Sequence, residues 1–175
     1  KCVALYVSGD LHPETLDALL AMDVAAGNYP LVYEAEDPYY HAAFLHAFGG
    51  RMLDEHDGFG MAGPEAAESL ELVRDMQRKH QLPEEPSGAL VLQLFSSGKA
   101  AAAISGPWLA ADLKNVAYRV VPLPTVRGRK MRPLLTVDAA FLTPHGAKDP
   151  DARAFARFLG GASAAVTRAT VGRQV

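Results

Sequence analysis

The sequence predicts an α/β fold in which helices flank a central, mostly parallel sheet. Short apolar runs rich in β-branched residues alternate with longer segments whose apolar residues recur at helical spacing. Glycine and proline residues separate most of these segments, as they do at the ends of strands and helices. Alternation of strands with helices is typical of layered proteins whose sheet is mostly parallel.

The first half of the chain is predicted to form two strands, at 3–7 and 30–33, and three helices, at 12–26, 38–48 and 64–80. Proline opens two of these helices, at Pro38 and Pro64, where its missing N–H costs nothing. The helix at 64–80 has the clearest pattern, because acidic residues occupy its first turns and basic residues its last. A polar, glycine-rich loop at 51–63 precedes it.

The second half is predicted to form three strands, at 100–104, 118–123 and 134–142, and four helices, two opened by Ser87 and Pro107 and two at 149–159 and 163–171. The alanine-rich run at 100–104 is too short and apolar for any place but the inside of a sheet. The basic segment at 127–132 is expected to be a solvated hairpin-like loop between two strands and not a nucleic-acid-binding patch, because no aromatic residues are interleaved with its arginines.

Length and composition indicate a soluble globular protein of about one domain, or slightly more. The chain has 175 residues, of which 49% are hydrophobic and 21% are charged. Its net charge of −3 argues against nucleic-acid binding through bulk positive charge. The single cysteine, Cys2, excludes an internal disulfide, and no apolar run is long enough for a membrane-spanning helix. The chain opens at Lys1 inside a predicted strand, so we expect it to be part of a longer protein.

Two predicted strand-to-helix corners carry the clearest binding chemistry. One is Asp37-Pro38-Tyr39-Tyr40 and the other is Ser105-Gly106-Pro107-Trp108. In open α/β sheets, ligands bind where strands end and helices begin. Aromatic rings offer apolar faces and a carboxylate accepts hydrogen bonds from hydroxyls, and a sugar presents both kinds of surface. An alternative fits the same residues equally well: the rings are ordinary core aromatics and Asp37 only caps a helix.

Other motifs predict no catalytic, nucleotide or metal site. Residues 58–63 match G-x-G-x-x-G, but an acidic segment precedes them where a hydrophobic strand is needed, and Pro64 follows. His41 and His46 are five residues apart and lie on different faces of a helix, so we expect no metal and no cofactor. No combination of base, nucleophile and anion hole can be assembled from the sequence, so we expect a protein that is not an enzyme.

Four segments occur in an order that is typical of one protein family. They are the helix–strand–helix block from Phe95 to Trp108, the corner Asp37-Pro38-Tyr39-Tyr40, residues 118–124 with the glycine-containing loop after them, and residues 133–143 with the helix at 149–159. Together they resemble the extracellular solute-binding proteins of carbohydrate ABC transporters, and the maltose/maltodextrin-binding proteins in particular. One such block is a moderate signal, and four in register across almost the whole chain are a strong one.

The resemblance implies a periplasmic-binding-protein-like lobe, one half of a two-lobed clamshell that closes on a sugar in the periplasm or outside the cell. Residues 1–142 would form the sugar-binding lobe, with hinge strands at 3–7 and 134–142, and residues 143–175 would be a helical segment of the other lobe. In the corner that Pro38 shapes, Asp37 would accept sugar hydroxyls. Tyr39 and Tyr40 would stack or form hydrogen bonds, and Trp108 would be a stacking platform. The implied partners are an oligosaccharide and the membrane subunits of the transporter.

Departures from the family pattern keep a second function open. The family's amino-terminal lobe and carboxy-terminal helical portion are absent, so the chain is expected to be truncated relative to the full clamshell and to bind sugar weakly. Lys1 stands where an acidic residue is expected, and Ser87-Gly88 replaces an aromatic residue that some relatives carry. In the alternative, the lobe is a non-catalytic interaction or assembly module that docks on the permease or self-associates through the faces left by missing segments. A membrane tether in the full-length protein is compatible with both functions.

Overall fold

The computed structural model describes residues 2–56 and 58–172. The chain divides into two compact units, one formed by residues 2–134 and the other by the segment from residue 135 onward. We describe each unit by itself. The first unit contains the central sheet and the predicted binding corners, and the second contains an extended segment followed by helices.

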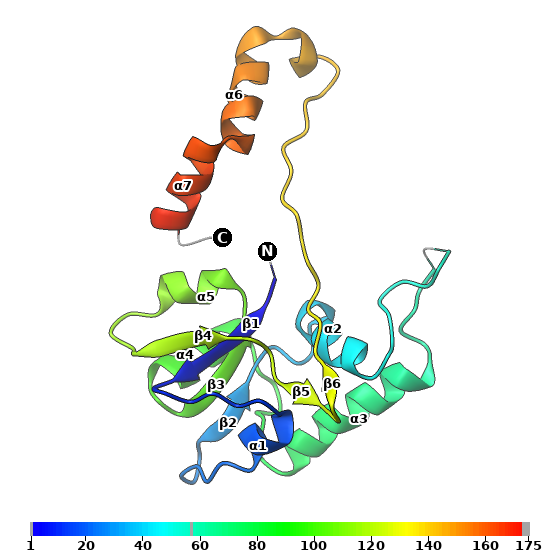
Figure 1. Cartoon of the computed structure of the whole chain (residues 1–175), viewed down its shortest axis with the longest axis vertical. Coiled ribbons are helices and arrows are strands. Elements are labelled where there is room, and N and C mark those ends of the chain that lie inside the picture. The colour runs from blue at the N-terminus through cyan, green and yellow to red at the C-terminus, as the bar shows by residue number, and fades with distance from the viewer. Residues whose placement is uncertain (1, 57, 173–175) are drawn as a thin grey trace. The chain divides into compact units, whose positions relative to one another are not determined.

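The central sheet has four strands within the described residues, in the order β2-β3-β1-β4. The strands are β1 (Ala4–Ser8), β2 (Tyr29–Val32), β3 (Ala100–Ser105) and β4 (Tyr118–Val121). β2 pairs with β3 in parallel, whereas β1 lies between β3 and β4 and runs antiparallel to both (Figure 1). The expectation of a mostly parallel sheet is therefore wrong, and the sheet is mixed. An apolar run is buried equally well in either direction, so its residue pattern does not encode the direction of the strand.

Helices cover both faces of this sheet. They are α1 (Leu16–Leu20), α2 (Pro38–Ala47), α3 (Pro64–Arg78), α4 (Gly88–Ser96) and α5 (Pro107–Asp112). Leu5 and Val7 of β1 pack in a core with residues of α1, α2 and α3. Tyr6, which lies between them in the sequence, packs in a second core with residues of α4 and α5. Successive side chains of a strand point to opposite faces, so the two cores lie on opposite sides of the sheet.

One segment of the first unit differs from the sequence prediction, and another agrees with it. The helix expected at 12–26 is the short α1, because the side chain of Thr15 accepts a hydrogen bond from the backbone N–H of Ala18 and caps the helix there. The basic segment at 127–132, expected to be a hairpin-like loop, supplies the turn and the second strand of a small antiparallel hairpin of β5 (Thr125–Val126) and β6 (Arg129–Lys130). Arg127 and Gly128 form its turn with φ values of 50° and 74°, which suit a two-residue hairpin.

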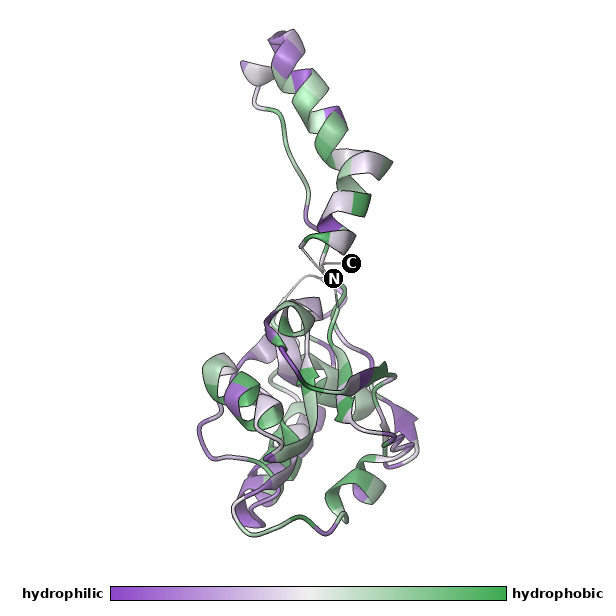
Figure 2. Cartoon of the chain, turned by 90° about the vertical axis from the view of Figure 1, so that its left-hand side faces the viewer, coloured by the Kyte–Doolittle hydropathy of each residue, from purple (hydrophilic) through white to green (hydrophobic). Residues whose placement is uncertain are grey.

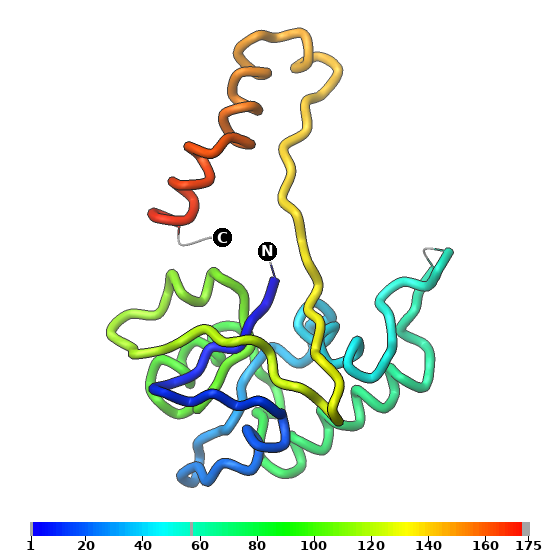
Figure 3. The backbone as a smooth tube through the Cα atoms, in the orientation of Figure 1, coloured from blue at the N-terminus to red at the C-terminus, as the bar shows by residue number. Residues whose placement is uncertain are grey.

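The second unit contains η1 (Gly146–Lys148), α6 (Pro150–Gly160) and α7 (Ala162–Thr170). Figure 2 shows that α6 and α7 carry hydrophobic residues interleaved with hydrophilic ones. The strand predicted at 134–142 is wrong for the described residues: the segment is extended but belongs to no strand ladder (Figure 3). Strand formation requires a partner strand, and an apolar alternating pattern does not supply one. Val137 and Phe141 of this segment are 80% and 91% exposed.

Candidate ligand-binding site

The first corner is built where the chain leaves β2 and enters α2. The Oδ1 atom of Asp37 accepts a hydrogen bond of 2.8 Å from the backbone N–H of Tyr39, and Pro38 occupies the first turn of the helix. Aspartate followed by proline is a favourable helix start, because the carboxylate satisfies a free N–H and proline has none to satisfy. Asp37 and Pro38 are exposed, and Tyr39 is half-buried. The local sequence therefore fixes this corner and leaves its carboxylate at the surface.

The second corner lies at the end of β3, where Gly106 and Pro107 turn the chain into α5. A Cβ atom at Gly106 would collide with the six-membered ring of the Trp108 indole, so only glycine allows the indole to fold back over the backbone. The buried hydroxyl of Tyr6 donates a hydrogen bond of 2.8 Å to the carbonyl oxygen of Gly106. The indole of Trp108 thus packs on the backbone at Gly106, which a hydrogen bond from Tyr6 of β1 connects to the sheet.

The structure brings the aromatic residues of the two corners together. The rings of Tyr39 and Trp108 have centroids 6.2 Å apart and are tilted by 37°. Tyr40 meets Trp108 edge-on at 6.4 Å and meets Tyr39 edge-on at 5.5 Å. Both corners follow the carboxyl ends of the parallel pair β2 and β3, and this shared edge places them side by side.

The three rings differ in what they can offer to a ligand. Tyr40 is only 5% exposed and belongs to the core, so its ring packs against Tyr39 and Trp108 and offers little surface to a ligand. Burial is the main cause that raises the pKa of its phenol, followed by a hydrogen bond to the Glu34 carboxylate. Tyr39 and Trp108 are half-buried and pack against the core. Of the five predicted site residues, four therefore reach the surface and Tyr40 is a supporting residue.

The sequence analysis missed Glu34, which lines two hollows beside the rings. One cavity of about 380 Å³ includes Ser105 and Trp108 in its wall, and another of about 520 Å³ includes Asp37 and Glu85. Glu34 lies close behind β2 at the same sheet edge as Asp37, and this position was the signal that could have identified it.

The sequence analysis did not reveal the role of Gly88, the first residue of α4. A Cβ atom at Gly88 would lie 2.9 Å from one carboxylate oxygen of Glu34, which is closer than such atoms approach in proteins. Glycine at this position leaves the room that the Glu34 carboxylate occupies. The absence of a side chain at Gly88 therefore leaves space beside α4 for the carboxylate of Glu34, which follows the end of β2. Ser87 caps α4 through its hydroxyl.

The remaining motifs serve local structure. In the glycine-rich loop, the Asp54 carboxylate accepts hydrogen bonds from the backbone N–H groups of His56 and Gly58, which lower its pKa. His41 is buried against Ser69, and the ring of His46 pairs with the carbonyl oxygen of Arg132. Within the described residues, no three histidine, cysteine, aspartate or glutamate side chains are grouped as metal ligands would be.

The family of this chain follows from a comparison of its sequence with protein-family models. Within residues 2–56 and 58–172, no helix has the length and apolar character needed to cross a bilayer. A family model described as bacterial extracellular solute-binding protein matches residues 4–166, which include both corners and all four strands of the central sheet. The chain therefore belongs to the bacterial extracellular solute-binding proteins, which are the periplasmic or extracellular solute-binding components of ABC transporters.

Proposed function

We propose that this protein binds a carbohydrate of the maltose or maltodextrin type and delivers it to the membrane subunits of its transporter. The observation that supports this proposal is the meeting of Tyr39 and Trp108 beside the carboxylates of Asp37 and Glu34. A pyranose ring has apolar C–H faces that suit aromatic rings and a rim of hydroxyl groups that suits carboxylates. The family generally acts without catalysis, and binding alone accounts for every group at this edge.

The residues have separate roles in this proposal. Trp108 is the stacking platform, and Tyr39 extends the aromatic surface at an angle to it. Asp37 holds the start of α2 with one oxygen, and a carboxylate with two oxygens has capacity left to accept a sugar hydroxyl. Glu34 accepts further hydroxyls from the neighbouring cavity wall.

The proposed site is one wall of a clamshell. A second lobe, outside the described first unit, would close over the sugar, with residues 3–7 and the extended segment 134–142 as the connecting hinge segments. The isolated wall is then expected to bind weakly, because the sugar is not enclosed. A membrane tether in the full-length protein would keep the complex close to the permease.

Titration of the protein with maltose and maltotriose tests the proposal. Trp108 is the only tryptophan in the sequence, so its emission reports directly on the site. We expect both sugars to change this emission, and calorimetry to show binding weakened about tenfold or more in Tyr39→Leu, a loss of about 1.4 kcal/mol or more. An unchanged emission together with no heat of binding would contradict the proposal.

Asp37→Asn separates the charge from the helix cap. Asparagine caps a helix as well as aspartate does, so the variant removes the charge and keeps the helix start. We expect maltose binding to weaken three- to tenfold, as for the loss of one charge-assisted hydrogen bond. Asp149→Asn is the matched control, because Asp149 and Pro150 start α6 in the same way in the other unit. Equal affinities of the two variants would remove Asp37 from the site.

A second candidate function rests on exposed apolar side chains. Leu135, Val137 and Phe141 are exposed in the extended segment, and the exposed rings of Phe155 and Phe158 stack on each other. Surfaces of this kind favour association, so the alternative is a module that docks on the permease or self-associates. Light scattering over a wide concentration range tests self-association, because a monomer at high concentration contradicts it.

A further inference from the structure

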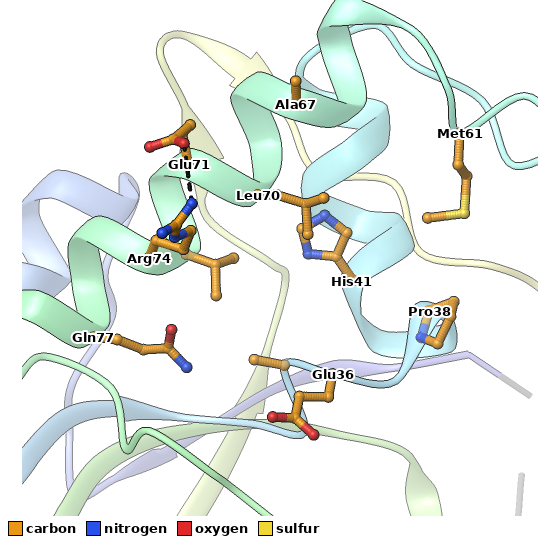
Figure 4. Close-up of a pocket in the computed structure, with 11 residues that line it drawn as sticks. Glu36, Pro38, His41, Met61, Ala67, Leu70, Glu71, Arg74 and Gln77 are labelled. Carbon is orange, nitrogen blue, oxygen red and sulfur yellow. Dashed lines mark ion pairs between the residues drawn. The ribbon is translucent and has the colours of Figure 1, made fainter.

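A further cavity of about 470 Å³ lies between α2 and α3, and the aromatic residues Tyr39 and Trp108 do not line it (Figure 4). Its wall is mostly hydrophobic and includes Ala35, Met61, Leu70 and Val73. Two charged residues of the wall, Glu71 and Arg74, form an ion pair of 3.5 Å with each other. The cavity is therefore a mostly apolar hollow in which Glu71 and Arg74 pair with each other and Glu36 is the remaining charged residue of the described wall.

One polar group in this wall has its hydrogen-bonding state fixed by the structure. His41 of α2 is only 3% exposed, and its Nε2 atom lies 2.9 Å from the hydroxyl oxygen of Ser69. The same hydroxyl donates its single hydrogen to the carbonyl oxygen of Ala66 at 2.8 Å. Ser69 can therefore only accept from His41, and the imidazole must carry its proton on Nε2.

The other ring nitrogen is left as an acceptor without a donor. Nδ1 of His41 has no hydrogen-bond partner among the described residues. Burial lowers the pKa of the imidazole, so the ring is neutral and Nδ1 keeps its lone pair. A buried acceptor without a donor is destabilising, and a ligand that supplies the donor recovers that free energy. In Figure 4 the ring lies beside Leu70, with Glu36 and Gln77 on the other side of the hollow.

We propose that this cavity is a second ligand site, which takes a small apolar molecule carrying one hydroxyl or N–H group. The donor of the ligand bonds to Nδ1 of His41, and its hydrocarbon part packs against Met61, Leu70 and Val73. Methionine and an exposed leucine adapt easily to a ligand, and Leu70 is 47% exposed, so its side chain can turn to admit one. This site shares Glu36 with the wall of the hollow beside Asp37 and also contains Pro38. It differs from the proposed sugar site in the ligand it accepts, since a polyhydroxylated ring would leave most of its hydroxyls without partners in an apolar hollow.

Phenol and anisole are the matched probes for this proposal. They are similar in shape, but only phenol has a hydrogen to donate. In ¹⁵N-resolved NMR spectra of the protein, the His41 Nδ1 signal is expected in the range of an unprotonated ring nitrogen and should move toward the protonated range on addition of phenol. We expect phenol to bind three- to tenfold more tightly than anisole, as for one hydrogen bond. Excess maltose is expected not to displace phenol.

His41→Phe removes the acceptor and preserves a ring in the place where the imidazole stacks on Phe44. Ser69 keeps its hydrogen bond to Ala66, so the variant leaves no buried group unpaired and is expected to fold. Phenol should then bind no better than anisole. Equal affinities of the two probes in the wild-type protein, or a proton found on Nδ1, would overturn the proposal, and neither measurement depends on the variant.

Discussion

At the scale of single residues, the interior contains two tyrosines with opposite hydrogen-bonding states. Tyr33 is fully buried and stacks on Phe44 with ring centroids 5.0 Å apart, yet its hydroxyl has no partner among the described residues. Tyr6 is also buried, and its hydroxyl donates to the carbonyl oxygen of Gly106. A buried polar atom stabilises only if it is paired, so the same chemical change should have opposite effects at the two positions.

We expect Tyr33→Phe to raise the free energy of unfolding by about 1 kcal/mol, because it removes an unpaired hydroxyl and keeps the ring. Tyr6→Phe is expected to lower the free energy of unfolding by about 1 kcal/mol, because it leaves the Gly106 carbonyl without its donor. Urea-induced unfolding of both variants measures the two effects under one set of conditions. A loss of stability in Tyr33→Phe would show that its hydroxyl has a partner, such as a bound water.

At the scale of elements, the corner between β3 and α5 depends on one close approach. We expect Gly106→Ala to lower the free energy of unfolding by about 1–3 kcal/mol, because the new methyl group must displace the Trp108 indole. The emission of the displaced indole should shift in the folded variant. Gly160→Ala is the matched control: no heavy atom lies within 4 Å of its added Cβ, and alanine favours the helix by up to about 1 kcal/mol. Equal stabilities of the two variants would mean that the indole relaxes freely.

The elements that the sequence predicted well are those specified by their own residues. Pro38 and Pro107 each start a helix as expected, since capping and proline geometry act within one turn. The segment at 134–142 shows the opposite case, because a strand exists only beside a partner. The antiparallel direction of β1 was also beyond prediction, since it depends on strands that follow about a hundred residues later.

The proximity of the two corners could be predicted from the sequence, because it also depends on local features of the chain. Tyr39 and Trp108 meet because each follows the end of one of two parallel neighbours, which a strand-to-helix pattern indicates. The sequence analysis missed Glu34, because an acidic residue in a polar segment is usually solvated. Only the structure shows that Gly88 leaves space for the Glu34 carboxylate. The burial of Tyr40 depends on packing against distant parts of the chain, so the sequence did not distinguish it from Tyr39.

At the scale of the whole molecule, three buried phenols determine how the protein responds to alkali. Burial raises the pKa of Tyr6 from 10.0 to about 12, and it also raises the pKa values of Tyr33 and Tyr40. The unfolded chain loses these protons first, so the folded state binds more protons above pH 10.0 and stability falls as pH rises.

Urea unfolding across the alkaline range measures this effect. The contribution of Tyr6 to the free energy of unfolding should be constant below pH 10.0 and should decline toward pH 12. Tyr6→Phe is expected to be less stable at neutral pH but to lose less stability over this interval. Parallel pH profiles of the variant and the wild type would contradict the assignment.

The central position of β1 also affects how the molecule is made. Both partners of this strand come from residues 100–121, which follow it by about a hundred residues in the chain. A nascent chain therefore carries an apolar strand with unpaired edges until about a hundred further residues have emerged. Factors that shield growing chains will encounter it at Leu5 and Val7, because the sheet can close only after both later strands have left the ribosome.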